Sequence, residues 1–402
     1  MFNNKILVAV TALGILAGSN AFASRAHEVV MGTGDGGTIL NGGSFFFDDN
    51  RNMFYNPAYI NDFKNWATIE KSNAPRGTAE AGFVTSFTNF NLGVYFNRGD
   101  AFVGFPGLAS NQGGGGSTPG TTYLPDASGS YTSGSGAGNP LRPIELLVGG
   151  DMGVKWGLGL TYASSSSNAG TNGKAGTSAP ATPGNKGYFG AQIGASIANL
   201  EPFFGMNFIG RNLDKDLNSH YYRGGVRYHW GEWTPYAAVL STNYNDERVA
   251  GTLNKLTGTN WGLGLGRSAK IAEGVRMNYA LSYWNVHEKN ETNGGTGTPT
   301  VETKWNRSIV PVDMAIEGDL ASWITLRGGF AFRIWDSVGG TAAQDVADTT
   351  TARLGAGLHF GKADIDFAFG MGQSATEGAQ ADSQTLGVSE NLFTAASLTY
   401  HW

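Results

Sequence analysis

The chain has 402 residues, no cysteine, 61 glycines, 12% aromatic residues and only 15% charged residues. The absence of cysteine excludes a disulfide framework and thiolate metal sites, and the mild formal net charge of −5 predicts no nucleic-acid partner. Soluble globular proteins carry about 25% charged residues, so this composition is atypical of a soluble fold. The length would allow two or three domains, but an uninterrupted strand pattern favours one.

The first residues have the features of a secretory signal peptide. Lys5 supplies a positive charge, residues 6–17 form a short apolar run, and residues 21–23 (Ala-Phe-Ala) form a small-x-small cleavage site. We therefore expect residues 1–23 to be removed and the mature chain to begin at Ser24. Because no later segment has about 18 consecutive apolar residues, the exported chain is periplasmic, secreted or an outer-membrane barrel.

Residues 24–64 precede the first predicted strand. The tripeptide Asn56, Pro57 and Ala58 lies shortly before that strand, and it resembles a pattern in the long-chain fatty-acid transporter family of outer-membrane barrels. The resemblance implies a fourteen-strand barrel whose N-terminal segment tucks inside as a plug. We therefore expect a periplasmic or plug segment here. The alternative is a simple Asn-Pro turn. The plug candidates are Phe45, Phe46, Phe47, Asn56, Pro57 and Ala58.

From residue 65 onward the sequence predicts one strand after another. Leu354, Leu358 and Phe360, for example, alternate with Gly355 and Gly357, which is the period of two of a strand with one apolar face. The expected strands are 65–71, 78–88, 91–98, 142–150, 153–163, 187–198, 200–211, 219–230, 233–244, 258–269, 274–287, 302–317, 322–334, 349–360, 363–373 and 391–402.

The polarity of the two faces separates a sandwich from a barrel. The outer face of a sandwich tends to carry many charged residues, whereas the polar face here is mostly Gly, Ser, Thr and isolated Arg. Aromatic residues such as Trp156 and Trp230 gather near strand ends, as in the girdles of transmembrane barrels. Overall, the pattern resembles the porin-like outer-membrane proteins of bacteria.

The links between strands alternate between short and long. The long links, such as 99–141, 164–186 and 374–390, are rich in Gly, Ser and Thr, and this rhythm is typical of periplasmic turns and external loops. We predict an all-β fold: a single closed antiparallel transmembrane β-barrel over residues 65–402, with about sixteen strands and fourteen as the alternative. An even number places both termini in the periplasm.

The chain ends on an aromatic residue. Leu398, Tyr400 and Trp402 share one face of the last predicted strand, and this resembles the closing strand of outer-membrane barrels, which the barrel assembly machinery reads. These three residues are the candidate assembly signal. The alternative is an edge strand that happens to end in Trp.

Charged residues on the inward face are the candidate pore lining. Guanidinium groups along a water-filled bore attract anions, and facing carboxylates add a transverse field, so both would set selectivity. The alternative is that these groups pair with one another, stiffen the wall or hold a plug. The candidates are Arg223, Arg227, Arg276, Arg307, Arg327, Arg333, Arg353, Asp313, Glu317, Asp364 and Asp366.

No pattern predicts an enzyme, a cofactor or a metal site. His287 lies near an external strand end without a matching acidic pair, and His229, His359 and His401 lie toward the periplasmic side. The leading hypothesis is an outer-membrane porin of a Gram-negative bacterium that passes small hydrophilic solutes. The alternatives are a plugged transporter of hydrophobic ligands and a structural or adhesive barrel. Expected partners are outer-membrane lipid, lipopolysaccharide, the assembly machinery and small solutes, with a homotrimer possible by analogy.

Overall fold

The computed structural model describes ten stretches of the chain. The predicted signal peptide, residues 1–23, and the predicted external link 99–141 lie outside them. The described residues are 24–32, 43–72, 79–98, 143–166, 185–212, 217–246, 252–294, 300–340, 349–374 and 395–402.

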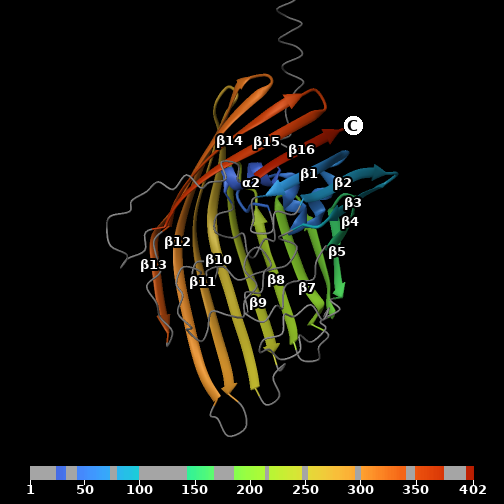
Figure 1. Ribbon diagram of the computed structural model, residues 1–402. Helices are drawn as coiled ribbons and strands as arrows, with labels where there is room; N and C mark the ends of the chain where they lie inside the picture. Colours follow the sequence, from blue (N-terminus) through green and yellow to red (C-terminus); the bar gives the residue numbers. More distant parts are fainter. Residues whose placement is uncertain are drawn as a thin grey trace, which may run out of the picture.

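The strands form one closed antiparallel barrel in chain order, and β16 pairs with β1 to close it (Figure 1). The predicted fold class is confirmed, with sixteen strands in the described residues and not the fourteen of the fatty-acid family. The strands are β1 (Trp66–Ser72), β2 (Ala79–Phe87), β3 (Phe90–Phe96), β4 (Ile144–Asp151), β5 (Lys155–Ser166), β6 (Asn185–Ser196), β7 (Leu200–Asn212), β8 (Leu217–Tyr228), β9 (Trp233–Asp246), β10 (Thr252–Ala272), β11 (Val275–Gly294), β12 (Thr300–Ala321), β13 (Ile324–Gly340), β14 (Thr349–Phe360), β15 (Ala363–Ser374) and β16 (Ala395–His401).

The wall is uneven in height. Strands β10, β11 and β12 have 21, 20 and 22 residues, whereas β1 and β16 have 7 each. A tilted bilayer crossing needs about 9–11 residues, so the long strands extend well beyond the membrane on the loop side (Figure 1). The sequence predicted shorter strands because their outer parts, such as residues 288–294, are polar on both faces.

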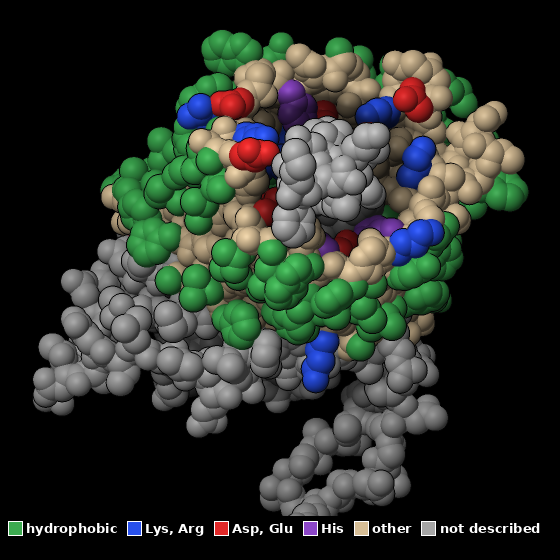
Figure 2. Space-filling model, turned by 90° about the horizontal axis from the view of Figure 1, so that it is seen from above, with side chains coloured by type: hydrophobic (Ala, Val, Ile, Leu, Met, Phe, Trp, Pro, Cys, Tyr) green, Lys and Arg blue, Asp and Glu red, His purple; other side chains and the backbone are tan. Residues whose placement is uncertain are grey.

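The outward face carries exposed apolar side chains on strands all around the barrel. Ile69, Leu263 and Leu354 are more than half exposed on it, and Trp230 and Trp323 lie exposed at the turn end. Figure 2 shows hydrophobic side chains around the flanks and charged side chains around the opening. A closed barrel with an apolar exterior is the arrangement that spans a bilayer. The described residues therefore form a closed β-barrel with the exterior of a transmembrane barrel.

The N-terminal segment lies inside the barrel (Figure 1). It contains α2 (Arg25–Met31) and two 3-10 helices, η1 (Asn50–Phe54) and η2 (Pro57–Asn61). Helix α2 contacts β12 to β16 and β1, and η2 contacts β3 to β6. We call residues 24–32 and 43–63 the plug. No helix in the described part of the chain has the length and apolarity to cross a membrane.

Capping residues explain where the plug helices begin. Ser24 accepts a hydrogen bond from the His27 amide at 3.2 Å, and Asp49 accepts from the amides of the first turn of η1. Asn56 caps η2, and Pro57 follows at its first turn, where a missing N–H costs nothing. The Asn-Pro-Ala tripeptide thus folds as a capped helical turn inside the barrel.

Candidate functional site

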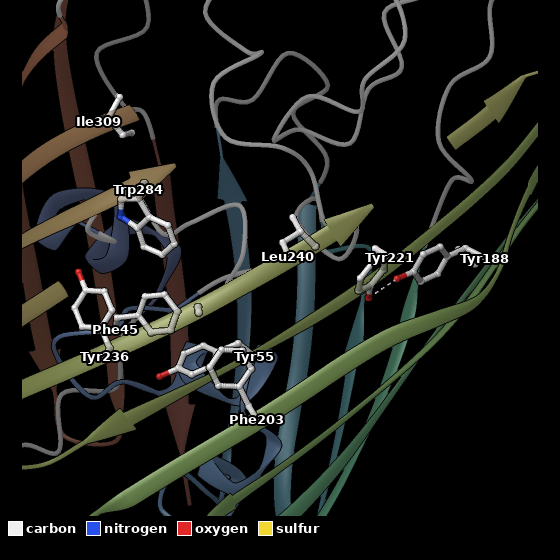
Figure 3. Packing of buried hydrophobic residues seen from close by; sticks show 11 residues of the cluster. Phe45, Tyr55, Tyr188, Phe203, Tyr221, Tyr236, Leu240, Trp284 and Ile309 are labelled. Carbon is white, nitrogen blue, oxygen red and sulfur yellow. Dashed lines mark hydrogen bonds between the residues drawn. The ribbon is translucent and has the colours of Figure 1, made fainter. Parts of the chain in front are cut away.

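The aromatic tip of the plug packs against aromatic residues of the wall. Phe45 stacks on Tyr236 of β9 with ring centroids 4.7 Å apart, and it also meets Trp284 of β11 and Phe203 of β7, each at 6.1 Å (Figure 3). Offset stacked rings contribute about 0.5–1.5 kcal/mol per pair beyond their area burial. The cluster continues along β5 to β12 as Ala163, Tyr188, Tyr221, Ala238, Leu240 and Ile309, so this side of the bore is apolar.

Arg227 of β8 holds the middle of the plug. Its Nη1 donates to the hydroxyl oxygens of Tyr55 and Tyr59 at 2.6 and 2.7 Å, and its Nη2 donates to Asp48 at 2.7 Å. Tyr59 in turn donates to Glu201 of β7 at 2.7 Å. The guanidinium is fully buried although Asp48 is half exposed, and it links the wall to the plug.

A second group of ion pairs surrounds η1. Arg51 contacts Glu28 of α2 and reaches Glu70 of β1 at 3.2 Å. Arg98 lies over the ring of Phe54, 3.9 Å from its centroid, and this cation–π contact is strengthened by burial. In the same region, Arg98 donates to Glu145 of β4 at 2.7 Å and Arg25 pairs with Glu80 of β2 at 2.7 Å.

A third group fixes α2 to β12, β13 and β15. Arg327 donates to Glu317 at 2.9 Å and to Asp366 at 2.6 Å. Both carboxylates also contact the plug, because Ser24 donates to Asp366 at 2.9 Å and His27 lies 3.3 Å from Glu317. The structure thus brings three predicted lining residues together with the plug.

The other predicted lining residues occupy different settings. Arg223 donates to the Phe54 carbonyl at 2.9 Å, and Arg276 is exposed at the start of β11. The remaining ones are paired within the wall: Arg307 and Arg333 with Asp336 at 2.9 and 3.5 Å, Arg353 with Asp313 at 3.6 Å, and Asp364 with His359 and His401 at 2.7 and 2.8 Å.

The structure also shows where the predicted assembly signal and the plug candidates lie. Leu398, Tyr400 and Trp402 point outward and are about half exposed. All six plug candidates are buried inside the barrel. In the part of the chain that the structure describes, no group of three or more acidic or histidine side chains is arranged to bind a metal ion.

Sequence reasoning missed several partners of the plug. Three of them are glutamates on the inward face of predicted strands: Glu70, Glu145 and Glu201. Applying the inward–outward alternation of side chains to β1, β4 and β7 as well would have identified them. Arg51 lies in no predicted strand. Arg98 ends the predicted strand 91–98 at an outward-facing position, whereas β3 ends at Phe96, so alternation identified neither residue. Their roles depend on contacts between distant parts of the chain.

Glycines of the inner face let the plug approach the wall. A Cβ atom added to Gly157 would lie 2.1 Å from the carbonyl carbon of Pro57, and one added to Gly329 would lie 1.9 Å from the carbonyl oxygen of Val30. Any larger residue would therefore clash with plug backbone, which has no flexible side chain to move aside. The small residues of this face make room for the plug.

Asp49 and His229 are among the groups of the plug region whose pKa values are raised. Complete burial, with help from the nearby charge of Glu28, raises the pKa of Asp49 to about 8. The hydrogen bond to Glu201, 3.0 Å away, raises the pKa of His229, which lies in the turn after β8. Asp49 Oδ2 is buried without a hydrogen-bond partner, so a neutral carboxyl suits its surroundings better than a carboxylate.

Plug docking is expected to weaken as the pH rises from about 4 to above 8. A carboxyl whose pKa rises from 3.8 to about 8 on folding stabilises the docked state fully below pH 3.8 and loses that stabilisation as the pH passes 8. His229 and Glu201 both belong to the wall, so the raised pKa of His229 stabilises the folded barrel, fully below pH 6.5 and no longer above its raised pKa. The measurement is protease cleavage of the plug against pH.

The matched control is Asp49→Asn, which keeps the cap to Arg51 and Asn52 but cannot ionise. It is expected to remove most of the pH dependence and to leave a docked plug at pH 8.5. A wild-type cleavage rate that is flat from pH 4 to 9, or an unchanged profile in Asp49→Asn, would contradict the assignment.

Comparisons with known proteins give only distant matches. No family model and no curated protein sequence matches the chain. Similar solved structures include a bacterial polysaccharide outer membrane secretin, 9% identical over 84% of this chain and 98% of that chain, with a TM-score of 0.43. OmpT of Vibrio cholerae is 12% identical over 84% and 95%, with a TM-score of 0.37. The CymD monoaromatic hydrocarbon channel is 12% identical over 93% and 98%, with a TM-score of 0.38. These matches are too distant to assign a function or a substrate.

Proposed function

We propose that the protein is a plug-gated transporter of the outer membrane that passes small apolar ligands, especially ones with an aromatic ring. The observation that carries this proposal is the aromatic cluster in which Phe45 of the plug stacks on Tyr236 and Trp284 of the wall. When the plug moves, the position of the Phe45 ring becomes a slot of matching chemistry. An apolar ligand entering it would recover the lost ring contacts.

The buried ion pairs favour this function over unrestricted diffusion of hydrophilic solutes. A diffusion pore needs charged side chains that project into a wet bore, whereas Arg223, Arg227 and Arg327 bind the plug or residues that touch it. A porin with this wall would first have to release its plug. Solute passage would then be gated, not passive.

The membrane and orientation follow from three features taken together. The predicted signal peptide favours export, the apolar exterior suits a bilayer, and the ends of β1 and β16 lie on the side of the short turns. We infer an outer membrane of a Gram-negative bacterium with both termini in the periplasm. The role is transport and not catalysis, because the buried charges of the bore are used in holding the plug.

The test is uptake of a labelled small aromatic hydrocarbon by cells that express the chain. Trp284→Ala removes one ring from the slot and is expected to lower the uptake rate about two- to tenfold, the equivalent of about 0.5–1.5 kcal/mol per ring contact. Trp335→Ala is the matched control, since Trp335 faces outward on β13 and is 48% exposed. Wild-type cells that take up no more than vector cells, together with open-channel conductance for sugars, would overturn the proposal in favour of a porin.

A further inference from the structure

Polar residues line the inner wall beyond the aromatic slot, toward the long loops. Thr242 of β9 and Glu288 of β11 both lie opposite Gly258 of β10, so the three form one row across the wall. In the next row toward the plug, Asn260 of β10 lies opposite Val286 of β11. Both Glu288 and Asn260 are buried, at 4% and 0% exposure.

These side chains lack partners. Glu288 Oε1, both side-chain amide atoms of Asn260 and Thr242 Oγ1 are buried without a hydrogen bond in the described structure. Elsewhere in the wall, buried carboxylates such as Glu145 and Asp366 have guanidinium partners. Buried polar groups in native proteins nearly always have a partner, and a buried charge above all needs one. These atoms are therefore available to a polar group that enters the bore.

The unpaired polar atoms of Glu288, Asn260 and Thr242 favour a cation with several hydrogen-bond donors. On the neighbouring strand β12, Arg307 lies opposite Val286 but is turned to Asp336, to which it donates at 2.9 Å. The acidic side chain without a partner is thus Glu288, whose buried carboxyl becomes a carboxylate when a cation binds beside it. An ammonium group offers three donors and one positive charge, which match the carboxylate, the Asn260 carbonyl oxygen and the Thr242 hydroxyl oxygen.

The residues next to this row also indicate the chemistry of the rest of the ligand, beyond its ammonium group. Trp284 lies two residues before Val286 on the same face of β11, with Phe45 of the plug stacked against it. Aromatic faces accept apolar groups and stabilise a nearby cation through their quadrupoles. A carboxylate ligand would add a second acidic group to the row, and a neutral hydroxyl would supply no positive charge to pair with a Glu288 carboxylate.

We infer that this wall is a binding site for the ammonium group of amines with a small apolar or aromatic body, with Glu288 as the counter-ion. The inference rests on the proposed function, because it names the substrate class of the same bore. Glu288 and Asn260 bind the head group, while Trp284 and the neighbouring rings bind the body.

The test is calorimetric titration of the refolded, full-length mature chain with three compounds of similar size. They are phenethylamine, 2-phenylethanol and 3-phenylpropanoate at neutral pH, where the amine is protonated. The wild-type chain is expected to bind the amine at least about tenfold more tightly than the other two, which is about 1.4 kcal/mol. Glu288→Gln, which keeps the shape and removes the charge, is expected to abolish this preference.

Glu291→Gln is the matched control. Glu291 lies on the same strand but on the opposite face, and pairs with Lys289 at 2.7 Å, so its loss is expected to leave the preference unchanged. Asn260→Ala provides a second variant, expected to weaken amine binding severalfold, in case Glu288→Gln fails the heat-modifiability test of folding.

The outcomes separate this inference from the proposed function. Equal binding of all three compounds, unchanged in Glu288→Gln and Asn260→Ala, would mean that only water satisfies the polar row. That result would overturn the amine site and leave apolar transport standing. Absence of binding by all three compounds would overturn both. Preference for the amine that survives in Glu288→Gln would also overturn the assignment of Glu288 as counter-ion.

Discussion

Deleting residues 24–63 is expected to turn a closed barrel into a conducting one. The plug fills the bore with buried aromatic and ion-paired side chains, including Phe45, Tyr55 and Arg51, each at most 1% exposed. Barrels of sixteen to eighteen strands leave an aqueous channel when nothing fills them, so conductance in a planar bilayer should rise about tenfold or more. The wild-type chain should show rare, small openings, and the deletion variant stable steps.

The control for this experiment is Lys155→Ala. It removes an ion pair with Asp62 at the turn end in which both partners are more than one-third exposed, and such pairs contribute little. Its conductance should match that of the wild type. If the deletion variant is folded, as shown by heat-modifiable migration, and stays silent, then the wall closes the bore itself and the plug is not the gate.

The fold could be predicted from the sequence because alternation is local. In residues 354–360 the alternation of apolar residues and glycines assigns each residue to the outer or the inner face of the strand. A chain with sixteen such strands is compatible with few folds. The heights of the strands could not be predicted as well. Residues 288–294 carry polar groups on both faces, so the period of two fades where β11 leaves the membrane, although the backbone pairing with β12 continues to Asn293.

The contents of the bore were harder to predict than its wall. The alternation of side chains along the strands predicts that Arg327 and Asp366 face inward. It does not reveal that Ser24 and His27 of the plug contact the same group of ion pairs. Arg51 is the clearest example of a contact that local patterns do not predict, because its partners Glu28 and Glu70 lie 23 and 19 residues away in the sequence. Such contacts depend on how the segment threads the barrel, and no local pattern encodes that path.

Arg227→Met is expected to release the plug and destabilise the docked barrel more than any other single substitution of the wall. The variant keeps the length and apolar stem of the side chain but removes a buried guanidinium. Buried Glu201 then keeps only His229 beside it, half-exposed Asp48 loses its cation, and the hydroxyl groups of Tyr55 and Tyr59 lose a donor. Breaking a buried pair by removing one partner costs about 3–5 kcal/mol. The free energy of unfolding and the frequency of channel openings measure the effect.

Arg267→Met is the matched control, since it removes the same group from an ion pair with Glu232 whose partners are 35% and 48% exposed. Exposed pairs contribute about 0–1 kcal/mol, so little should change. The double variant Arg227→Met with Glu201→Gln then distinguishes an electrostatic link from simple packing. Removing the second charge should recover part of the lost free energy, because fewer unpaired charges stay buried. Additive losses would instead mean that Arg227 serves mainly to fill space, and the plug would be held by its rings.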